Sequence, residues 1–307
     1  MPNSIGKDFT EGAGCRKRMN PKSFEYHAPN SVAEASSLAE KYGTDAKFLA
    51  GGQSLLPLMK LRLLSPSHLI DLGRIPGLSD IRDEGNHLAI GAMERIAEIV
   101  RSDLVRRQCP ILSECAHQIA DPLVRNMGTI GGNLSHADPT NDMPAVMVAA
   151  GASIVAASGR GSRVIPARDF FVDTFTTALK ETEILVEVKV PIGSTRRGVY
   201  LKLERQAGDF GIVGVAAVLE VSSDGRCVAA GIALTGVGPT VVKAARAEEI
   251  LKEAKLDKNV IDRASRAAAE EAQPTSDLRG SAEYKRAMVE IMTTKAIRAV
   301  ARRQAKR

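Results

Sequence analysis

The chain lacks tryptophan and is poor in aromatic residues of any kind: its 307 residues include four Tyr and seven Phe. Aromatic side chains supply the platforms on which single-stranded nucleic acid stacks, so their scarcity argues against that class of ligand. The formal net charge of +6 does not change this conclusion. Six basic residues and no acidic one lie between Lys295 and Arg307, so the excess charge belongs to a C-terminal tail. No nucleic-acid surface is therefore predicted.

Long apolar runs are also missing. No stretch of about eighteen apolar residues occurs, which excludes a transmembrane helix. The first nineteen residues are polar and include Arg16-Lys17-Arg18, without the apolar core of a signal peptide. We expect residues 1–20 to be a disordered extension and the protein to be cytoplasmic. A peripheral position at the inner face of the membrane stays open.

Cysteine motifs and the common catalytic motifs are absent as well. The four Cys (Cys15, Cys109, Cys115 and Cys227) are scattered and include no CxxC, so the chain lacks the spacing for its own iron–sulfur cluster or structural zinc. We interpret them as reduced, structural thiols. GxxxxGK[ST], GxGxxG, HExxH and GxSxG do not occur. The sequence thus argues against a self-contained hydrolase, kinase or Rossmann dehydrogenase, and predicts no catalytic side chain and no metal ligand.

The first part of the chain predicts a small α/β unit followed by a mixed one. A capping box at Ser31–Glu34 begins a helix that Gly43 ends. Strands are expected at 46–50, 68–72, 88–93, 153–157, 164–166 and 184–190. Helical periodicity covers 55–64 and 96–120, and Asp121-Pro122 breaks the second of these. Asp142 can cap a further helix that reaches Ala150.

After Pro191 the pattern changes to strands followed by helices. Three strands are expected at 199–204, 213–221 and 228–235, with Asp224-Gly225 as a hairpin signal between the last two. Helices are expected at 242–254 and 260–272, followed by a long basic helix from about Ser281. This order predicts an α+β C-terminal domain. The basic helix is either a solvated end or a docking surface for an acidic partner.

Two glycine pairs each follow a short apolar stretch: Ala50-Gly51-Gly52-Gln53-Ser54 and Thr129-Ile130-Gly131-Gly132-Asn133. A Gly-Gly turn lets consecutive backbone N–H groups point into one concavity, and the missing Cβ atoms let an anion approach closely. Ser54, Thr129 and Asn133 add hydroxyl or amide donors. Either pair alone is better explained as a tight turn, whereas both pairs together are explained about equally well as turns and as a diphosphate site.

These segments carry a family resemblance. The stretch LAGGQSLLP from Leu49 to Pro57 resembles the first flavin-binding segment of the FAD-carrying medium subunits of molybdenum hydroxylases. Asn126 to Asn133, followed by Ala137 to Asp142, resembles their second segment. The resemblance covers most of the chain. Among the xanthine dehydrogenase and aerobic carbon monoxide dehydrogenase relatives it is greatest to the carbon monoxide dehydrogenase medium chain, through Ile119–Pro122 and Gly208–Phe210.

The resemblance implies an α+β architecture. Residues 21–195 would form the two-lobed FAD-binding fold of the vanillyl-alcohol oxidase type, with lobes at about 21–75 and 76–195. Residues 196–307 would form a C-terminal domain like that of the carbon monoxide dehydrogenase flavoprotein, with a three-stranded sheet and helices.

The resemblance also implies which residues contact FAD. The first segment would cradle the diphosphate, and the second the diphosphate and the ribityl chain. Ile119 would line the flavin pocket, and Asp142 would bond the sugar or polar edge of FAD. Leu185 would pack against the adenine or the ring system, and Lys202 would lie beside the flavin. The full set is Leu49, Ala50, Gly51, Gly52, Gln53, Ser54, Leu55, Leu56, Ile119, Thr129, Ile130, Gly131, Gly132, Asn133, Asp142, Leu185 and Lys202.

Simpler interpretations exist for several of these residues. Asp142 could act only as a helix cap, and Lys202 could be a solvated surface lysine. Phe210, where relatives place an aromatic residue near the flavin, could instead be a core residue. His136 is interpreted as facing solvent. Gln53 replaces the His of many relatives, but both side chains can donate a hydrogen bond.

The function implied by the resemblance is electron transfer through FAD. Electrons would leave a molybdenum cofactor on a large partner subunit and cross two [2Fe–2S] clusters on a small one. They would then reach this FAD and pass to NAD or a quinone-type acceptor. The expected assembly is a dimer of heterotrimers. Two alternatives are a free-standing FAD oxidoreductase and a non-catalytic assembly subunit. The substrate stays open among carbon monoxide, an aldehyde, and a purine or other N-heterocycle.

Overall fold

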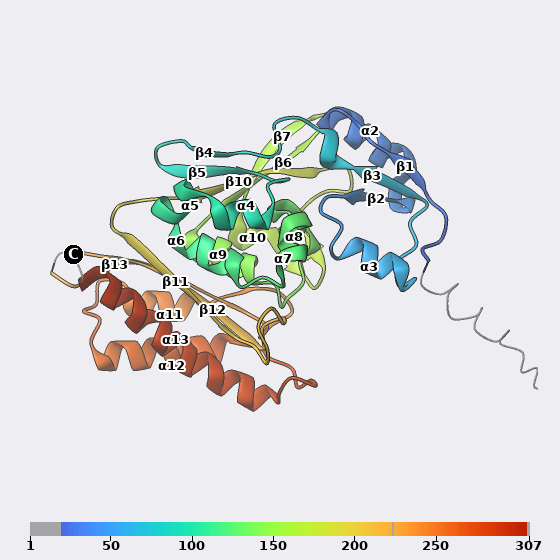
Figure 1. Cartoon of the computed structure of the whole chain (residues 1–307). Coiled ribbons are helices and arrows are strands. Elements are labelled where there is room, and N and C mark those ends of the chain that lie inside the picture. The colour runs from blue at the N-terminus through green and yellow to red at the C-terminus, as the bar shows by residue number, and fades with distance from the viewer. Residues whose placement is uncertain (1–19, 223, 306–307) are drawn as a thin grey trace, which may run out of the picture.

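A computed structural model describes residues 20–222 and 224–305 (Figure 1). The predicted disordered extension, and Cys15 with it, lies outside the described residues apart from Asn20. In Figure 1 the N-terminal unit (blue) and the C-terminal unit (orange to red) lie at opposite ends, with the antiparallel sheet and its helices between them. No helix in the described part of the chain has both the length and the apolar character needed to cross a membrane.

The N-terminal unit is a three-stranded parallel sheet with helices on it. Its strands have the order β1 (Glu25–His27), β3 (His68–Asp71), β2 (Ala46–Leu49). The capping box is confirmed, because the Ser31 hydroxyl accepts a hydrogen bond from the Glu34 N–H at the start of α2 (Val32–Tyr42). Helix α3 (Leu55–Lys60) follows β2 after a short loop and is shorter than predicted. Strand β1 was not predicted.

The middle unit is a five-stranded antiparallel sheet. Its order is β4 (Ile81–Asp83), β5 (His87–Gly91), β10 (Ile184–Pro191), β6 (Ser153–Ser158), β7 (Gly161–Pro166). A small hairpin of β8 (Phe171–Asp173) and β9 (Thr176–Thr177) follows the short helix α10 (Ala167–Phe170). The edge strand β4 and this hairpin were not predicted; all are three residues or shorter, too short for a period-two pattern to identify.

The helical periodicity over 96–120 corresponds to three helices. These are α4 (Ile96–Arg101), α5 (Asp103–Gln108) and α6 (Pro110–His117). The Ser102 hydroxyl caps α5, and Pro110 occupies the first turn of α6, where its missing N–H costs no helical hydrogen bond. The predicted break at Asp121 is confirmed, because its carboxylate caps α7 (Pro122–Met127). The single predicted helix was therefore too long.

The C-terminal unit has a four-stranded antiparallel sheet rather than three strands. Its order is β11 (Arg196–Leu203), β12 (Val213–Val221), β13 (Cys227–Thr235), β14 (Val242–Lys243). The predicted hairpin joins β12 to β13, and Gly225 adopts a positive φ of 81° there. The predicted helix over 242–254 begins late: β-branched Val242 pairs with Leu234, and α11 covers only Ala245–Leu251. Helices α12 (Lys258–Glu271) and α13 (Ala282–Ala305) match the prediction.

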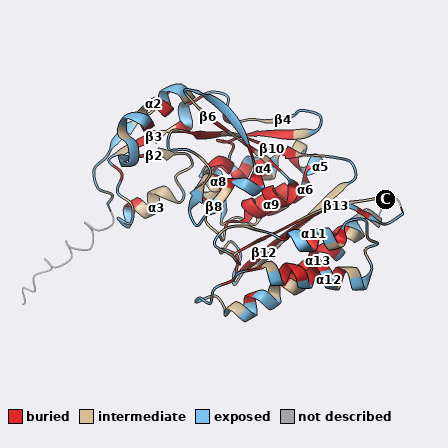
Figure 2. Ribbon diagram, turned by 180° about the vertical axis from the view of Figure 1, so that it is seen from behind, coloured by how far each residue is buried: buried red, intermediate tan, exposed pale blue. Residues whose placement is uncertain are grey.

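The central strand β12 of the C-terminal sheet is packed on both faces. Along β12, Val215, Ala217 and Leu219 belong to the core formed with α11–α13. The alternating residues Ala216 and Val218 instead join the core of the middle unit. There the sheet packs on α9 (Asp142–Ala150), a helix whose residues are all buried (Figure 2). The two units therefore share one continuous packed interface.

The buried thiols agree with their predicted structural role. Cys109 and Cys115 lie in the middle core and Cys227 in the C-terminal core. Burial raises the pKa of Cys109 and of Cys227 to about 11 and that of Cys115 well above its ordinary value. All three therefore stay protonated and unreactive near neutral pH.

The ion pair between Glu183 and Arg163 makes a testable contribution to the stability of the middle unit. Arg163 holds the carboxylate through two 2.8 Å hydrogen bonds and lowers its pKa from 4.5 to about 2. Because the folded pKa is depressed, the stabilisation is complete above pH 4.5 and is lost as pH falls toward 2. We expect Glu183→Gln to lower the free energy of unfolding by about 1–2 kcal/mol at pH 7, since Arg163 is 40% exposed and screened.

Urea unfolding at a series of pH values measures this effect, and the difference from the unsubstituted protein should shrink below pH 4.5. The control is Glu40→Gln, which removes an exposed pair with Arg160 and should change the stability by less than about 0.5 kcal/mol. Equal losses in the two variants would contradict the assignment.

Candidate functional site

The two glycine segments lie against each other. A Cβ atom added to Gly51 would lie 2.2 Å from the carbonyl oxygen of Met127, and one added to Gly132 would lie 3.3 Å from the Cβ of Ala50. The loop after β2 therefore packs backbone against backbone on the turn that precedes the second segment. Only glycine permits this approach, because any side chain at Gly51 would overlap that carbonyl group.

The second segment is a helix and not a turn, which corrects the prediction. Thr129 caps α8 (Ile130–His136), and Gly131 and Gly132 occupy its first turn. Glycine is a poor helix former, but here it lets α8 pack closely against the segment at Ala92. A Cβ on Gly131 would lie 2.6 Å from the Cβ of Ala92. Close packing thus outweighs the local preference.

The N–H groups of the two segments differ in availability. Those of α8 are already used, since Gly131 N donates to Ala92 O at 2.8 Å and Gly132 N to the Thr129 hydroxyl at 3.1 Å. In the first segment, no described residue accepts a hydrogen bond from the backbone N–H groups of Gly52, Gln53 or Ser54. The loop thus offers three successive donors beside a glycine-lined surface, a concavity of the kind that holds anions.

One buried polar atom of the second segment also has no partner. Asn133 Oδ1 makes no hydrogen bond to any described residue, although it is shielded from solvent. A buried acceptor without a partner is costly, so such an atom marks a place where a ligand or water binds. The loop donors therefore suit an anionic group, whereas the Asn133 oxygen suits a hydroxyl or another hydrogen-bond donor.

A buried ionic cluster lies next to this arrangement. The Lys202 side chain is only 1% exposed, so it is not the solvated lysine of the alternative interpretation. Its Nζ lies 3.0 Å from Asp142 Oδ2, 3.3 Å from Glu204 Oε2 and 3.1 Å from the carbonyl oxygen of Gln118. The Tyr200 hydroxyl donates to Asp142 Oδ1. The cluster joins β11 to the ends of α6 and α9.

Burial dominates the protonation behaviour of this cluster. It raises the pKa of Asp142 in spite of Lys202, because removing the carboxylate from water outweighs the attraction of the ammonium group. It also raises the pKa of Tyr200 well above the ordinary value, and the negative charge of Asp142 adds to this effect. The Tyr200 hydroxyl therefore remains a donor throughout the neutral range.

The cap interpretation of Asp142 is wrong. Asn141 occupies the cap position, and Asp142 is the first residue of α9, with its carboxylate turned to Tyr200 and Lys202. Tyr200 and Glu204 were missed in the sequence analysis. Their signal was the alternating spacing of Tyr200, Lys202 and Glu204 along the predicted strand 199–204, which places all three on the same face; in the structure Glu204 directly follows the end of β11.

The glycine segments and the ionic cluster are connected by one hydrogen bond. Asn141 Nδ2 donates to Asn133 O at 3.0 Å, immediately before Asp142. The Ile119 backbone is held by Arg125, whose Nη1 bonds Ile119 O at 2.8 Å. Leu185 belongs to neither group by any hydrogen bond among the described residues; it is buried in the middle core on β10, opposite Ala156, and α8 packs on that strand.

Two further predictions have clear outcomes. Phe210 is 48% exposed, so it is not a core residue, and Arg279 lies over its ring at 5.7 Å. His136 is not simply turned to solvent: its ring lies 5.1 Å from that of Phe175, and partial burial lowers its pKa.

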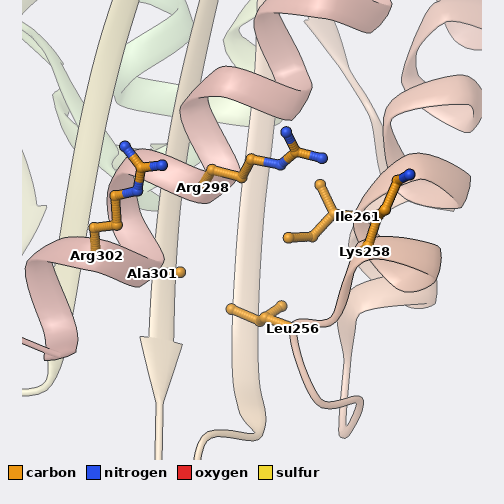
Figure 3. A pocket seen from close by; sticks show the side chains of 6 residues that line it. All are labelled: Leu256, Lys258, Ile261, Arg298, Ala301 and Arg302. Carbon is orange, nitrogen blue, oxygen red and sulfur yellow. The ribbon is translucent and has the colours of Figure 1, made fainter.

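A separate hollow of about 430 Å³ lies between α12 and α13 and is not part of this site (Figure 3). Its lining is basic and apolar: Leu256, Lys258, Ile261, Arg298, Ala301 and Arg302. The end of α13 is not simply solvated, because Arg303 bonds the carbonyl oxygen of Gly198 at 2.8 Å and lies 2.9 Å from Glu114. This contact holds the basic helix against the rest of the chain.

Comparison with known proteins identifies the two parts of the chain. Residues 22–193 match the family model of the FAD-binding domain in molybdopterin dehydrogenase. Residues 198–300 match that of the carbon monoxide dehydrogenase flavoprotein C-terminal domain. The chain therefore belongs to the family of FAD-binding medium subunits of molybdopterin dehydrogenases. The family resemblance inferred from the two glycine segments is thereby confirmed.

The similarity to individual relatives extends over nearly their whole length. The chain is 44% identical to the carbon monoxide dehydrogenase medium chain of Hydrogenophaga pseudoflava, over 92% of this chain and 98% of that one. It is 39% identical to the 6-hydroxypseudooxynicotine dehydrogenase complex subunit alpha of Paenarthrobacter nicotinovorans, over 91% and 96%. Carbon monoxide dehydrogenase from Hydrogenophaga pseudoflava lacking the Mo-pyranopterin moiety superposes with a TM-score of 0.90 at 45% identity, covering 92% and 98%.

The site fits the cofactor of this FAD-binding subunit family. A diphosphate needs many neutral donors and close backbone approach, and the N–H groups of Gly52, Gln53 and Ser54 supply both. Asn133 Oδ1 could accept a hydrogen bond from a sugar or ribityl hydroxyl group. Asp142 is different, since Tyr200 and Lys202 already engage its carboxylate.

The ionic cluster of the FAD-binding subunit can be tested directly. We expect Lys202→Met to lower the free energy of unfolding by about 3–5 kcal/mol, because it leaves the buried Asp142 and the partly buried Glu204 without a positive partner. The double variant Lys202→Met/Asp142→Asn should recover part of this loss, since it removes a buried charge together with its partner.

Chemical unfolding of the two single variants and the double variant measures the coupling energy. Lys47→Met, at an exposed strand position on β2, serves as the control and should leave the stability nearly unchanged. A loss for Lys202→Met no larger than that of the control would show that the cluster does not hold the two units together.

Proposed function

We propose that this chain is the electron-transferring FAD subunit of a molybdenum-containing dehydrogenase. The observation that carries the proposal is the backbone contact between the two glycine segments, which creates a donor-rich cradle at the joint of two sheets. This arrangement suits a dinucleotide diphosphate, and the chain supplies no catalytic acid, base or nucleophile motif of its own.

The proposed division of roles among the residues follows from their geometry. Leu49 to Leu56 and Thr129 to Asn133 would hold the diphosphate and the ribityl chain, with Ile119 beside the flavin. Lys202 would orient the segment around Ile119 through Gln118 O, while its charge is balanced by Asp142 and Glu204. Asp142 would act on the cofactor chiefly through this cluster. Leu185 would contribute through the core behind the site. Bound FAD would supply the redox chemistry.

The polypeptide would divide near residue 195 into these functions. Residues 21–195, with lobes at about 21–75 and 76–195, would bind FAD. Residues 196–307 would cover it and contribute Lys202. The matched ranges of the two family models and the change of sheet between β10 and β11 support this division.

The partners would be a large subunit with the molybdenum cofactor and a small subunit with two [2Fe–2S] clusters, arranged as a dimer of heterotrimers. Electrons would enter from the clusters and leave to NAD or a quinone-type acceptor. Relatives that match nearly the full chain are named as the medium chain or a subunit of dehydrogenases, which supports a multi-subunit enzyme. Their names indicate different substrates, which supports a substrate site on another chain.

The cradle itself can be tested with a matched pair of glycine variants. Gly51→Ala should weaken FAD binding about 10- to 100-fold, because the added Cβ overlaps Met127 O and overpacking of this kind costs about 1–3 kcal/mol. Gly193→Ala should bind FAD normally, since its Cβ would lie 3.5 Å from the flexible Arg196 side chain. Flavin absorbance after gel filtration and titration of the stripped protein with FAD measure both.

Circular dichroism must show that both glycine variants are folded for this comparison to apply. If folded Gly51→Ala binds FAD as tightly as Gly193→Ala, the cradle is not the FAD site. If the unsubstituted chain takes up no FAD at all, a non-catalytic assembly role is favoured instead.

Purification of the native protein tests the assembly. We expect two further chains to co-purify, with molybdenum and iron in the complex, and the flavin of the complex to be bleached by the substrate under anaerobic conditions. Carbon monoxide, aldehydes and N-heterocycles form the first panel of substrates. A chain that purifies alone and turns over a substrate without molybdenum would be a free-standing FAD oxidoreductase, and the proposal would be wrong.

A further inference from the structure

Two histidines and a glutamate meet on one face of the N-terminal sheet. Strands β1 and β3 run parallel, and their register pairs Glu25 with His68, so these two side chains point to the same side. His27 lies two residues after Glu25 and points to that side as well. Residues that are 41 positions apart along the chain are thereby brought together.

The ligand atoms of this cluster have the spacing of a tetrahedral metal site. His27 Nε2 lies 3.2 Å from His68 Nδ1, and Glu25 Oε2 lies 3.5 Å from His68 Nδ1 and 3.9 Å from His27 Nε2. Zinc–ligand bonds to N and O of about 2.0–2.2 Å place neighbouring ligand atoms about 3.3–3.6 Å apart in a tetrahedron. The one longer edge belongs to the Glu25 side chain, which is 70% exposed and free to rotate.

The imidazole rings are held in place before any ion binds. The Tyr42 ring, at the end of α2, stacks on His68 with centroids 3.7 Å apart and on His27 at 5.1 Å. The two histidine side chains are only 20% and 17% exposed. The rings are thus sheltered by the sheet and by α2, and the cluster opens to solvent on the side of Glu25.

We propose that Glu25, His27 and His68 bind a divalent transition-metal ion of the Zn²⁺ class. Two imidazole nitrogens and one carboxylate oxygen would be the protein ligands, with a fourth position open to water. This donor set suits Zn²⁺ and related ions, whereas Mg²⁺ and Ca²⁺ prefer oxygen ligands alone. His87, which lies 2.7 Å from Glu84 but has no second histidine beside it, lacks such a set.

The site is separate from the glycine cradle. Glu25, His68 and Ala46 align at the amino ends of the parallel strands, whereas Gly51 follows the carboxyl end of β2. A bound ion would link the edge strand β1 to the central strand β3. It would thereby stabilise the N-terminal sheet without touching the cradle, so metal binding and FAD binding can be measured independently.

Zinc content of the full-length chain tests the proposal. The protein is used without a histidine tag and with Cys15→Ser, to remove a competing thiol, then stripped with a chelator and dialysed against Zn²⁺. We expect about one tightly bound zinc per chain and a higher Tm with zinc. His27→Ala and His68→Ala should each bind zinc more than about 100-fold more weakly, because loss of even an outer partner of a ligand costs about 10–100-fold.

His87→Ala is the matched control and should keep its zinc. Glu25→Gln covers the case in which a histidine variant fails to fold, since Glu25 is exposed; it should weaken binding about 10-fold or more, with an unchanged circular dichroism spectrum. The proposal is wrong if the unsubstituted chain binds no zinc, or if His27→Ala or Glu25→Gln binds zinc as tightly as the unsubstituted chain. The two imidazoles would then form only a hydrogen-bonded pair. A normal FAD content in the same samples would show that the loss of zinc binding is not caused by loss of the FAD site.

Discussion

The backbone contact between Gly51 and residues Met127 and Gly128, at the end of α7, is the constraint on which the candidate site depends. It fixes the loop that leaves the parallel sheet against the start of α8, which in turn packs on the antiparallel sheet. Neither sheet alone would create this concavity. Among the described residues, the N–H groups without an acceptor belong to one segment and the Asn133 oxygen without a donor to the other. The cradle exists only because the two sheets meet through a backbone contact that is too close for any residue but glycine.

A second contact, of a different kind, attaches the C-terminal sheet. Most of that interface is ordinary apolar packing of β12 and β13 on α9. Within it, Lys202 crosses to Asp142 and to the carbonyl oxygen of Gln118. A buried ion pair adds little net stability, but it restricts the geometry, because the charge is tolerated only when its partners are in place. The cluster therefore sets how β11 lies against the segment around Ile119.

The sequence predicts those features that depend on local signals. The capping box at Ser31, the hairpin at Gly225 and the break at Asp121 each involve residues within a few positions of one another, and each is confirmed. The two glycine segments and their family could be recognised from short motifs. The relation between them could not, since it depends on close approach of backbones about 80 residues apart.

The errors also share a physical cause. The low helix propensity of Gly131 and Gly132 predicts a turn. They are helical nonetheless, because α8 packs so closely on Ala92 and Ala50 that larger residues would not fit. Asp142 has the pattern of a cap, yet the fold supplies Tyr200 and Lys202 as its partners. The contact between the His27 and His68 side chains likewise depends on the register of two strands. In each case tertiary contacts outweigh the local pattern.

A cradle made of backbone N–H groups has a consequence for how such a subunit can vary. The donors of Gly52, Gln53 and Ser54 persist through most side-chain changes, so only substitutions that disturb the close approach should remove the site. A site of this kind would recognise a diphosphate and would carry no information about an oxidised substrate. Relatives named for carbon monoxide and for a nicotine derivative can therefore share this chain's architecture, because the part that discriminates between their substrates need not lie in it.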